Sequence, residues 1–444
     1  MNSATRFTTR TTRTVVTAAS VLALTLAGCS GSGPTAGASE GTYPVVFGVF
    51  NPFSGGEAAF GPEKMAGCLT AVNLINHAGG LLTHKQVNCQ SFDDRDDPVD
   101  AVPAAEQMVA TTSHLVGVVG PTSDSGTATA PIINRAQITM FSDSGERTFD
   151  HTTLKYFWRI VPPDEDAGLA MALWAKTKGY TRAAAVFGND ISEQGNVPAL
   201  IKGYTYLGGT ITINQAVALD ASSYRSEVAQ MLATNPQAIF TEMDPQSAAT
   251  YFSELAQSHP LIPIVGTAGT EGPDWWKAVG QAIGPQNMKT YYVGVQPYVN
   301  PSGAAWSKYN DSLTQVGSQI QNPAQYVADP YAMAVYDAVT VMGLAMTAAH
   351  STNPTVYNAY VPKVVAAGNG AVVVHDFADG KIALDQGKSI DYVGTTGPIT
   401  FNQWHNSPGA FEVNSVDPSN LNNLPLITTI SAAQVAALAK AAGI

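Results

Sequence analysis

Short apolar runs alternate with longer amphipathic segments along most of the chain. Runs with the length and composition of buried parallel strands lie at residues 44–50, 87–92, 115–119, 139–142, 183–187, 211–217, 238–241 and 262–265. Segments with helical spacing separate them. The segment at residues 62–78 carries one apolar stripe, made of Met65, Leu69, Val72 and Ile75. Strands alternating with helices of this length predict an α/β fold with parallel sheets covered on both faces.

The alternation runs twice, once before residue 150 and again from about residue 166. Two runs of similar rhythm predict two doubly wound domains rather than one barrel. Within them we expect a short helix at residues 128–136 and a single helix over residues 192–206. Asp97-Pro98 has the pattern of an N-cap and first helical turn, although Pro103 would either kink that helix or mark its start.

Two further helices are expected late in the chain. Residues 329–349 carry an apolar stripe of Val335, Val339, Met342 and Met346. The tail at residues 431–444 is rich in Ala, with Val435 and Leu438 at helical spacing, which predicts a terminal helix with a structural role.

The first 28 residues have the pattern of a targeting segment. Three arginines precede an apolar run of about 12 residues, too short to span a bilayer. The sequence Leu26-Ala27-Gly28-Cys29 resembles a bacterial lipobox, which implies cleavage before Cys29 and acylation of that cysteine. The alternative is an ordinary secretory signal with a chance cysteine. Residues 29–42, rich in Ser, Gly and Ala, are expected to form a flexible tether.

Composition narrows the class of protein. Only 13% of the 444 residues are charged, 45% are hydrophobic, and the net charge is −12. These values argue against wholesale disorder, and the acidity argues against nucleic acid as a partner. After the first thirty residues no apolar run approaches the ~18 residues of a membrane span. The cysteines other than Cys29 are Cys68 and Cys89, which in an exported protein predict a disulfide; the alternative is two buried free thiols.

Enzyme and metal signatures are absent from the sequence. After the first predicted strand it contains no G-x-S-x-G elbow, H-E-x-x-H motif or P-loop, and the eight histidines of the chain have no metal-ligand spacing. The acidic run at residues 93–97 is explained by a turn beside Pro98 as readily as by a cation site. We therefore expect no metal, no cofactor and no catalytic residue. A serine hydrolase using Ser123 or Ser144 is the weaker alternative, since it needs a base that the sequence does not identify.

The loops after the predicted strands are the candidate binding segments. In a doubly wound sheet, ligands lie beyond the carboxyl ends of the strands, where the strand order reverses. Two of these loops contain Ser-Asp-Ser-Gly, at residues 123–126 and 142–145. They are either two independent turn sequences or two polar walls that face a ligand.

Several motifs along the chain occur together in one family. They are Asn51-Pro52-Phe53-Ser54-Gly55, Phe60-Gly61, residues 72–80 (VNLINHAGG), Asp93-Asp94, Gly120-Pro121-Thr122-Ser123, Phe157-Trp158-Arg159, Tyr336-Asp337-Ala338-Val339 and residues 397–401 (GPITF). In this order and spacing, from Tyr43 to about Phe411, the chain resembles the type I periplasmic binding proteins of ABC importers, specifically the branched-chain amino-acid (Leu/Ile/Val) receptors.

The resemblance implies two α/β lobes joined by a hinge of three crossovers, with a ligand between them. We place the crossovers near residues 159–163, 293–298 and 394–401. The N-terminal lobe is then expected to comprise residues 43–160 and 295–396. The C-terminal lobe is expected to comprise residues 161–294 and its completion with the tail helix, residues 397–444.

The resemblance also implies ligand contacts, and these depart from the amino-acid pattern. The mapped residues are Phe60, Ser123, Asp124, Ser125, Ser144, Gly145, Glu146, Ser192, Asp244 (or Met243) and Ala268. Asp124 stands near the family serine and Glu146 where a threonine is usual, while the usual Tyr and Glu of the second lobe are missing. Two carboxylates would repel an anionic ligand group unless Arg147 neutralises one.

A cationic, amide-bearing or polyhydroxyl solute is therefore expected rather than a plain branched-chain amino acid. The alternative is that Asp124 and Glu146 are solvated loop acids outside the pocket. By resemblance, we expect a monomeric lipoprotein on the extracytoplasmic face of a bacterial membrane. It would pass a small polar solute (an amino acid, amide or related compound) to an ABC permease and its ATPase. The alternative is a lipid-anchored sensor that signals to a partner kinase.

Overall fold

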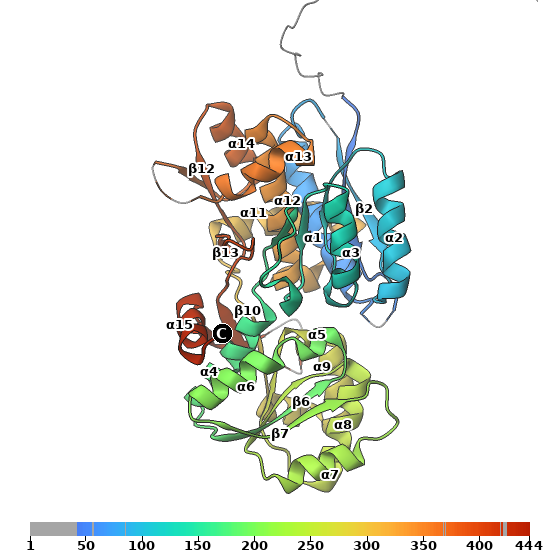
Figure 1. Ribbon diagram of the computed structural model, residues 1–444, viewed down its shortest axis with the longest axis vertical. Helices are drawn as coiled ribbons and strands as arrows, with labels where there is room; N and C mark the ends of the chain where they lie inside the picture. Colours follow the sequence, from blue (N-terminus) through green and yellow to red (C-terminus); the bar gives the residue numbers. More distant parts are fainter. Residues whose placement is uncertain are drawn as a thin grey trace, which may run out of the picture. The chain divides into compact units, whose positions relative to one another are not determined.

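The computed structural model describes residues 42–444 apart from residues 56, 85, 367, 369, 418 and 421–423. The predicted signal peptide, the lipidation site at Cys29 and most of the predicted tether therefore lie outside the described residues. The described residues belong to one compact unit of the chain. Within this unit, two parallel sheets with helices on both faces form two lobes (Figure 1).

The first lobe contains a five-stranded sheet in the order β2-β1-β3-β4-β5, with every pair parallel. Its strands are β1 (Val45–Asn51), β2 (Val87–Asp93), β3 (Leu115–Val119), β4 (Met140–Ser142) and β5 (Phe157–Arg159). Along β1, Phe47 and Val49 point to one apolar cluster while Phe50 points to another. Successive side chains of a strand alternate between faces, so an uninterrupted apolar run predicts a strand that is covered on both.

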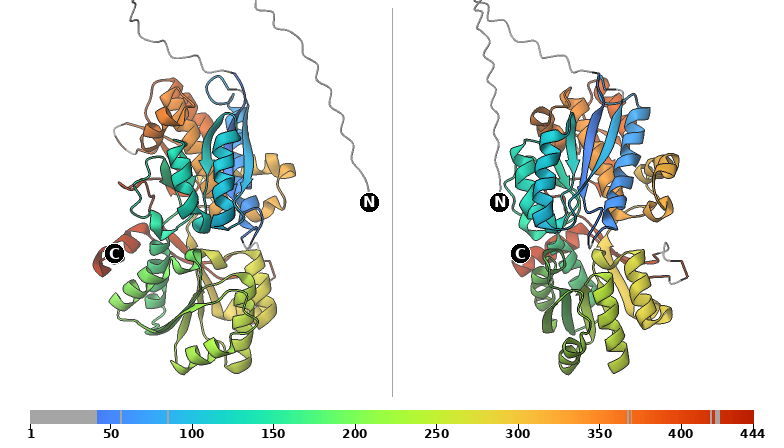
Figure 2. Two further views of the ribbon diagram at one scale, coloured as in Figure 1. Left: turned by 45° about the vertical axis from the view of Figure 1, so that its right-hand side comes forward. Right: turned by 90° about the vertical axis from the view of Figure 1, so that its right-hand side faces the viewer.

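Helices from two distant parts of the chain cover this sheet. The helices α2 (Pro98–Thr111) and α3 (Ser123–Arg135) supply one face, and α1 (Phe60–His77) with α12 (Pro330–Ala349) supplies the other. Figure 2 shows helices on both sides of the sheet. The late part of the lobe also includes α11 (Ala304–Val316), α13 (Pro354–Tyr357), α14 (Phe377–Asp385) and a three-stranded sheet of β11 (Val372–Val374), β12 (Ile390–Gly394) and β13 (Gly397–Pro398).

The second lobe repeats the same strand order and extends it. Its seven-stranded sheet runs β15-β14-β10-β9-β8-β6-β7. The strands are β6 (Arg182–Gly188), β7 (Thr210–Val217), β8 (Ala238–Glu242), β9 (Ile264–Gly266), β10 (Tyr292–Pro297), β14 (Phe411–Asn414) and β15 (Leu426–Ile430). Taken in chain order, β6 to β10 have the arrangement 2-1-3-4-5 that β1 to β5 have, and the late strands β14 and β15 join by antiparallel pairing.

Helices also cover both faces of the second sheet. On one face lie α4 (Asp164–Thr177), α6 (Val197–Tyr206) and α15 (Ala432–Ala442); on the other lie α7 (Arg225–Ala233), α8 (Pro245–Ser258), α9 (Pro273–Ile283) and α10 (Pro285–Tyr291). The tail helix α15 packs Val435 and Leu438 against this lobe, and Ser431 caps it with Gln434 in a reciprocal capping box.

Three segments connect the lobes and lie beside one another. The Ser407 N–H donates to the Arg159 carbonyl at 3.0 Å, and the Tyr298 N–H donates to the Ala410 carbonyl at 2.8 Å. The three segments enclose a cavity of about 30 Å³. The third connection lies further along the chain than expected, because residues 397–398 still pair with β12 in the first lobe. The expected boundary after residue 294 falls inside β10, which continues to Pro297 through its pairing with β14.

Two helix predictions were wrong in their bounds. The helix expected at residues 128–136 begins at Ser123, so Ser123–Gly126 forms its first turn rather than a loop. Small polar residues are tolerated there because the first four N–H groups of a helix need no intrahelical partner. The helix expected over residues 192–206 is divided into α5 (Ile191–Gln194) and α6, which begins at Val197 with Pro198 in its first turn.

Other helix signals were confirmed in part. The α2 helix begins at Pro98, its N-cap Asp97 accepts from the Val99 N–H at 2.6 Å, and the helix continues through Pro103. On α1, Val72 and Ile75 are buried as predicted, whereas Met65 and Leu69 are only partly buried. The reason is that α1 is covered by both the sheet and α12, so its most buried positions lie between them.

The α12 helix is the one helix in the described part of the chain with the length and apolar character of a membrane span, at a mean hydropathy of 1.5. The expectation that no such run follows residue 30 overlooked it, because Asp337 and two tyrosines interrupt the run. Its side chains are buried among those of α1 and the first sheet, the environment of a core helix in a large lobe.

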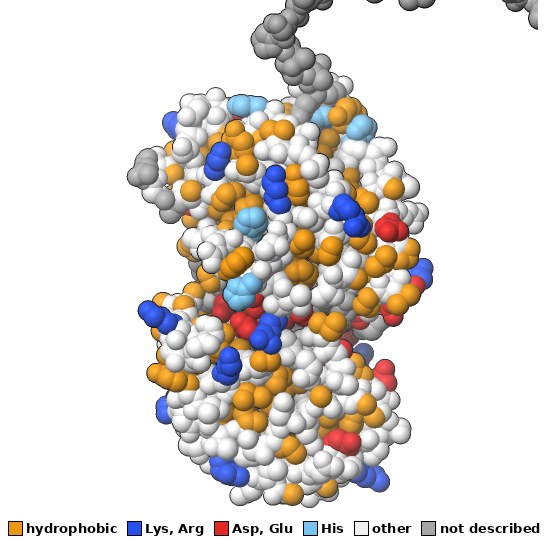
Figure 3. All heavy atoms as spheres, in the orientation of Figure 1, with side chains coloured by type: hydrophobic (Ala, Val, Ile, Leu, Met, Phe, Trp, Pro, Cys, Tyr) orange, Lys and Arg blue, Asp and Glu red, His pale blue; other side chains and the backbone are white. Residues whose placement is uncertain are grey.

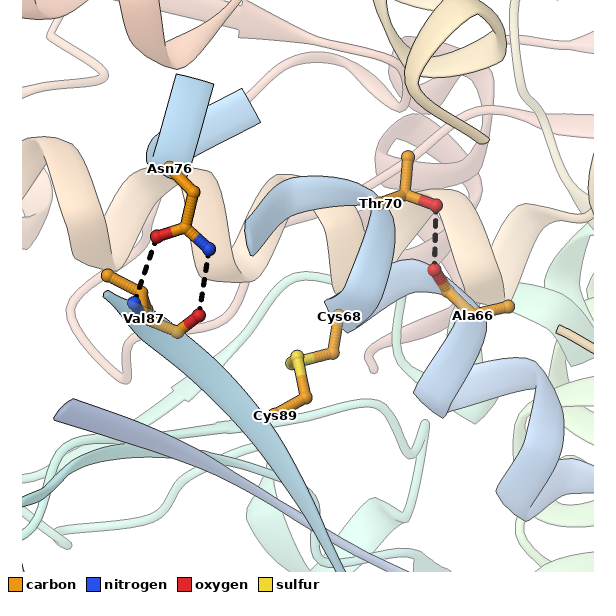
Figure 4. The surroundings of a disulfide bond; sticks show 6 residues. All are labelled: Ala66, Cys68, Thr70, Asn76, Val87 and Cys89. Carbon is orange, nitrogen blue, oxygen red and sulfur yellow. Dashed lines mark hydrogen bonds between the residues drawn. A yellow bond between two sulfur atoms is a disulfide. The ribbon is translucent and has the colours of Figure 1, made fainter. Parts of the chain in front are cut away.

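The predicted disulfide between Cys68 and Cys89 is present, with 6.2 Å between the two Cα atoms. It joins α1 to β2, the edge strand of the first sheet (Figure 4). A second link lies beside it, where the Asn76 amide donates to and accepts from the backbone of Val87, both at 2.9 Å. The edge strand is therefore held to its helix both covalently and by hydrogen bonds.

Candidate functional site

The strand order locates the candidate site. It reverses between β1 and β3 in the first sheet and between β6 and β8 in the second. Ligands of doubly wound sheets collect beyond the carboxyl ends of the strands at such points. The segments after these strands meet at the boundary between the lobes, where α3 contacts α5. Figure 3 shows Asp and Glu side chains gathered along this boundary.

Two acids lie on the second lobe's side of this boundary, which we call the second lobe's wall. The first is Glu242, at the end of β8. The Asn196 amide donates to its Oε2 at 2.7 Å from the start of α6. A side chain at Gly269 would overlap Oε1, so the glycine leaves room for the carboxylate. Burial raises the pKa of Glu242 well above its usual range, and the charge of Asp164 adds to that rise, while the nearby Thr267 hydroxyl opposes it.

Asp164 is the second acid, and it opens α4 just after the first connection between the lobes. Its backbone N–H donates to the Gly145 carbonyl in the first lobe at 2.8 Å. Side chains at Gly145 or at Gly195 would overlap its carboxylate, so the acid fits between two glycines. Burial raises the pKa of Asp164 to about 8; the Arg159 charge opposes this, and Glu146 and Asp150 add to it.

The first lobe's wall contains Lys64 on α1 and Tyr331 on α12. The Lys64 ammonium forms an ion pair with Glu63, lies 3.7 Å from Asp143 Oδ2, and sits 4.0 Å above the Tyr331 ring. Burial would lower the pKa of Lys64, but the charges of Glu63 and Asp143 outweigh it and raise the pKa. Burial also raises the pKa of the Asp143 carboxyl, to about 6, against the opposing charge of Lys64.

Tyr331 connects the two walls. Burial raises its pKa, and the next largest contributions come from the charges of Asp164 and Glu242 in the other lobe. Its ring therefore supports the Lys64 ammonium while the acids of the second lobe act on its hydroxyl. The arrangement offers carboxylates, an amide, a phenol and aromatic rings, which are groups suited to binding a polar molecule.

Four predicted residues lie at this boundary or beside it. The Phe60 ring is 5.5 Å from the Lys64 ammonium. The residues Ser144, Gly145 and Glu146 form the segment after β4, and the Ser144 hydroxyl accepts from the Glu146 N–H at 3.0 Å. Glu146 is 4% exposed, so it is not a solvated loop acid. Its Oε1 accepts from the Thr148 N–H at 2.9 Å, and its buried Oε2 has no hydrogen-bond partner.

Arg147 does not neutralise Glu146. Its Nε donates to Glu165 at 2.8 Å on the surface. The carbonyls of Gly145 and Glu146 instead accept from the fully buried Arg159, at 2.9 and 2.8 Å, and Arg159 also pairs with Asp150. Arg159 thereby holds the segment after β4 in place.

Three other predicted residues stabilise local structure. The Ser125 hydroxyl donates to buried Asp94 at 2.6 Å. The Ser192 hydroxyl donates at 3.2 Å to Asp190, which caps α5. Asp244 caps α8, accepting from the Gln246 N–H at 2.9 Å.

The remaining predicted residues add little to the picture of the site. Ala268 opens a short 3-10 helix beside Gly269. The side chains of Ser123 and Asp124 lie outside the described residues. The two Ser-Asp-Ser-Gly segments have different backbones: residues 123–126 form the first turn of α3, and residues 143–145 lie in the connection after β4.

Sequence reasoning missed the central residues of this boundary. They are Lys64, Asp143, Asp164, Asn196, Glu242 and Tyr331. Weak signals existed for two of them: Glu242 ends an apolar strand, and Asp164 follows a predicted connection between lobes. Within the ranges that the structure describes, no group of three or more His, Cys, Asp or Glu side chains is arranged to hold a metal ion.

The chain is similar to known periplasmic binding proteins. Residues 44–388 match the family model described as "Periplasmic binding protein". The "Leu/Ile/Val-binding protein homolog 3" of Brucella melitensis is 38% identical over 93 residues, which cover 20% of this chain and 25% of that relative. That match thus spans about a quarter of the relative's length.

Solved structures share the fold at low identity. A leucine-binding protein, LivK, from Thermotoga maritima superposes with a TM-score of 0.69 at 19% identity, over 87% of this chain and 99% of that one. LivJ from Streptococcus pneumoniae, solved with isoleucine, gives 0.68 at 17%, over 87% and 99%. A solute-binding protein from R. palustris, solved with benzoate, gives 0.67 at 15%, over 88% and 97%. With two doubly wound lobes, three connections and a match over most of its length, the chain belongs to the periplasmic binding protein family and has the fold of its type I members.

Proposed function

We propose that this protein captures a small polar solute, such as an amino acid, an amide or a related compound, between its lobes and delivers it to an ABC permease. The observation that carries the proposal is that polar segments of both lobes meet beyond the strand ends of both sheets, where Asp164 of one lobe lies against Gly145 of the other and donates to its carbonyl at 2.8 Å. Two structures support the class of function: the one solved with isoleucine is described as the substrate-binding protein of a branched-chain amino-acid transporter, and the one solved with benzoate as an ABC transporter solute-binding protein.

Binding is coupled to lobe closure in this proposal. A solute that contacts Asp164 or Glu242 together with Tyr331 touches both lobes, so it stabilises the closed arrangement over the open one. The three connections beside the 30 Å³ cavity act as the hinge. The permease recognises the closed form, and the groups at the boundary bind the solute without transforming it.

The test begins with the molecules that accompany the protein. Small molecules released by denaturing the purified protein are identified by mass spectrometry and returned to ligand-free protein by titration calorimetry. Small-angle scattering then measures the radius of gyration and the mass with and without the ligand. We expect binding, a smaller radius of gyration and a monomer mass. A tightly binding solute that leaves the scattering curve unchanged would count against closure.

We also propose that the mature chain begins at Cys29 and is attached to the extracytoplasmic face of the membrane by acyl chains on that residue. The chain made in a lipoprotein-processing bacterium should enter the detergent phase of a phase-partition assay. Its N-terminal peptide should carry the mass of acylated cysteine. Cys29→Ser should move the protein to the aqueous phase. Detergent-phase recovery of Cys29→Ser at the wild-type level would refute the anchor.

A further inference from the structure

We infer that the solute is a compact organic cation without a carboxylate, such as an aliphatic diamine or an aminoguanidine-type base. This inference rests on the proposed function and concerns the same site. It begins with Asp164 and Glu242, which lie against consecutive residues: the Asp164 carboxylate packs against Gly195, and the Asn196 amide donates to Glu242 at 2.7 Å. Both side chains are partly exposed, so they remain accessible to a solute.

The cations of the described residues at this boundary are engaged elsewhere. Lys64 is held by Glu63 and Asp143. Arg159 directs its guanidinium to two carbonyls and to Asp150. Arg147 pairs with Glu165. Neighbouring carboxylates are costly to ionise in a buried place, and a bound cation would lower that cost.

A second observation at the site also points to a donor-rich ligand. The Asn196 amide is 3% exposed, and its nitrogen donates to Glu242 at 2.7 Å. The amide nitrogen faces Glu242, which leaves the carbonyl oxygen as an acceptor. That oxygen is buried and has no hydrogen-bond partner. An N–H group of a ligand would satisfy this oxygen.

The first lobe's wall disfavours a ligand carboxylate. Asp143, 4% exposed at the end of the β4 segment, has no hydrogen-bond donor on either carboxylate oxygen. The nearby cation, Lys64, already faces two acids. An amino-acid carboxylate placed here would meet the Asp143 carboxyl rather than free hydrogen-bond donors. Asp143 would therefore repel such a ligand. The two walls together therefore select positive charge.

The experiment compares matched probes by titration calorimetry on the purified protein. Putrescine and agmatine are the cations, 1,4-butanediol is the neutral match to putrescine, and leucine and benzoate carry carboxylates. We expect one of the cations to bind at least 100-fold more tightly than 1,4-butanediol. The isosteric variants Glu242→Gln and Asp164→Asn should each weaken that binding at least 10-fold. Glu106→Gln, an exposed acid on α2, is the matched control and should leave it unchanged.

Each other outcome overturns the inference. Binding of leucine or benzoate without binding of either cation would refute it while upholding solute capture. Equal cation affinity in all variants would place the cation elsewhere. Absence of cation binding would refute the ligand class and leave solute capture to the co-purification experiment. If a variant fails to fold, the comparison of putrescine with 1,4-butanediol on the unchanged protein still tests whether the site selects a cation.

Discussion

At the scale of single residues, Asp337 is a buried carboxylate whose oxygens are satisfied by hydrogen bonds. This α12 carboxylate has no exposed surface and accepts five hydrogen bonds, from the Tyr392 hydroxyl at 2.6 Å and from the backbone and side chains of Thr395 and Thr396. Burial raises its pKa, and these hydrogen bonds oppose the rise. The residue therefore fixes the turn between β12 and β13 to the core helix.

We predict that Asp337→Asn destabilises the protein by about 2–3 kcal/mol, because an amide nitrogen would face hydrogen-bond donors and leave them unsatisfied. The urea midpoint of the far-ultraviolet circular dichroism transition measures this. Asp385→Asn, at an exposed acid on α14, is the control and should stay within about 0.5 kcal/mol of the original protein. Equal midpoints for the two variants would contradict the role given to Asp337.

At the scale of elements, Gly67 sets how closely α1 and α12 approach. A side chain at Gly67 would overlap the Ala332 carbonyl oxygen and approach Val335, both on α12. We predict that Gly67→Ala destabilises by about 1–3 kcal/mol despite the better helix propensity of Ala, since a backbone carbonyl cannot rotate away. Gly280→Ala on α9 is the matched control: its new methyl group would meet only the Met288 side chain, at 3.6 Å. That variant should be stabilised by about 0.5–1 kcal/mol. Thermal unfolding tests whether Gly67→Ala lowers the thermal midpoint and Gly280→Ala raises it.

The disulfide between α1 and β2 is a second feature that stabilises the packing of elements. It closes a loop with a sequence separation of 21 residues. On the chain-entropy model such a loop is worth about 3 kcal/mol. We expect Cys68→Ala with Cys89→Ala to lower stability by about that amount and to remove the response of the thermal midpoint to reductant. A double variant as stable as the original protein would show that the disulfide contributes little to the free energy of unfolding.

At the scale of the whole molecule, the acids near the lobe boundary link stability to pH. Burial raises the pKa of Asp164 to about 8, of Asp166 to about 7 and of Asp150 to about 6. In the unfolded chain these carboxyls ionise near pH 4. The folded state therefore binds more protons over this range, and stability must fall as the pH rises from about 4 to 8.

We predict a higher thermal midpoint at pH 5.5 than at pH 8 for the ligand-free protein, measured by scanning calorimetry at constant ionic strength. Asp164→Asn should flatten the profile between pH 6 and 8, because it removes the group with the highest of these pKa values. The exposed-acid variant Asp385→Asn should keep the original slope. A midpoint that rises from pH 5.5 to 8 would show that these carboxyls are paired in solution.

The sequence by itself determined the elements and the family. Apolar runs of strand length, helical stripes and caps such as Asp97 depend on neighbours within a few residues, so local patterns predict them. The disulfide followed from the cysteine count and from the packing of consecutive elements. Even here, the first turn of α3 was missed, because Ser-Asp-Ser-Gly suits both a loop and a helix start.

The site was decided by tertiary structure. Of the predicted ligand residues, Ser125, Ser192 and Asp244 make local hydrogen bonds, and their contact with a ligand stays a prediction, while Asp164, Glu242 and Tyr331 were not foreseen as a group. These three come from a helix start, a strand end and a late helix, far apart in the chain. Only the strand order of two sheets and the packing of one lobe against the other place them at one boundary. Their raised pKa values are likewise products of burial and of charges brought near by the fold, which no stretch of sequence contains.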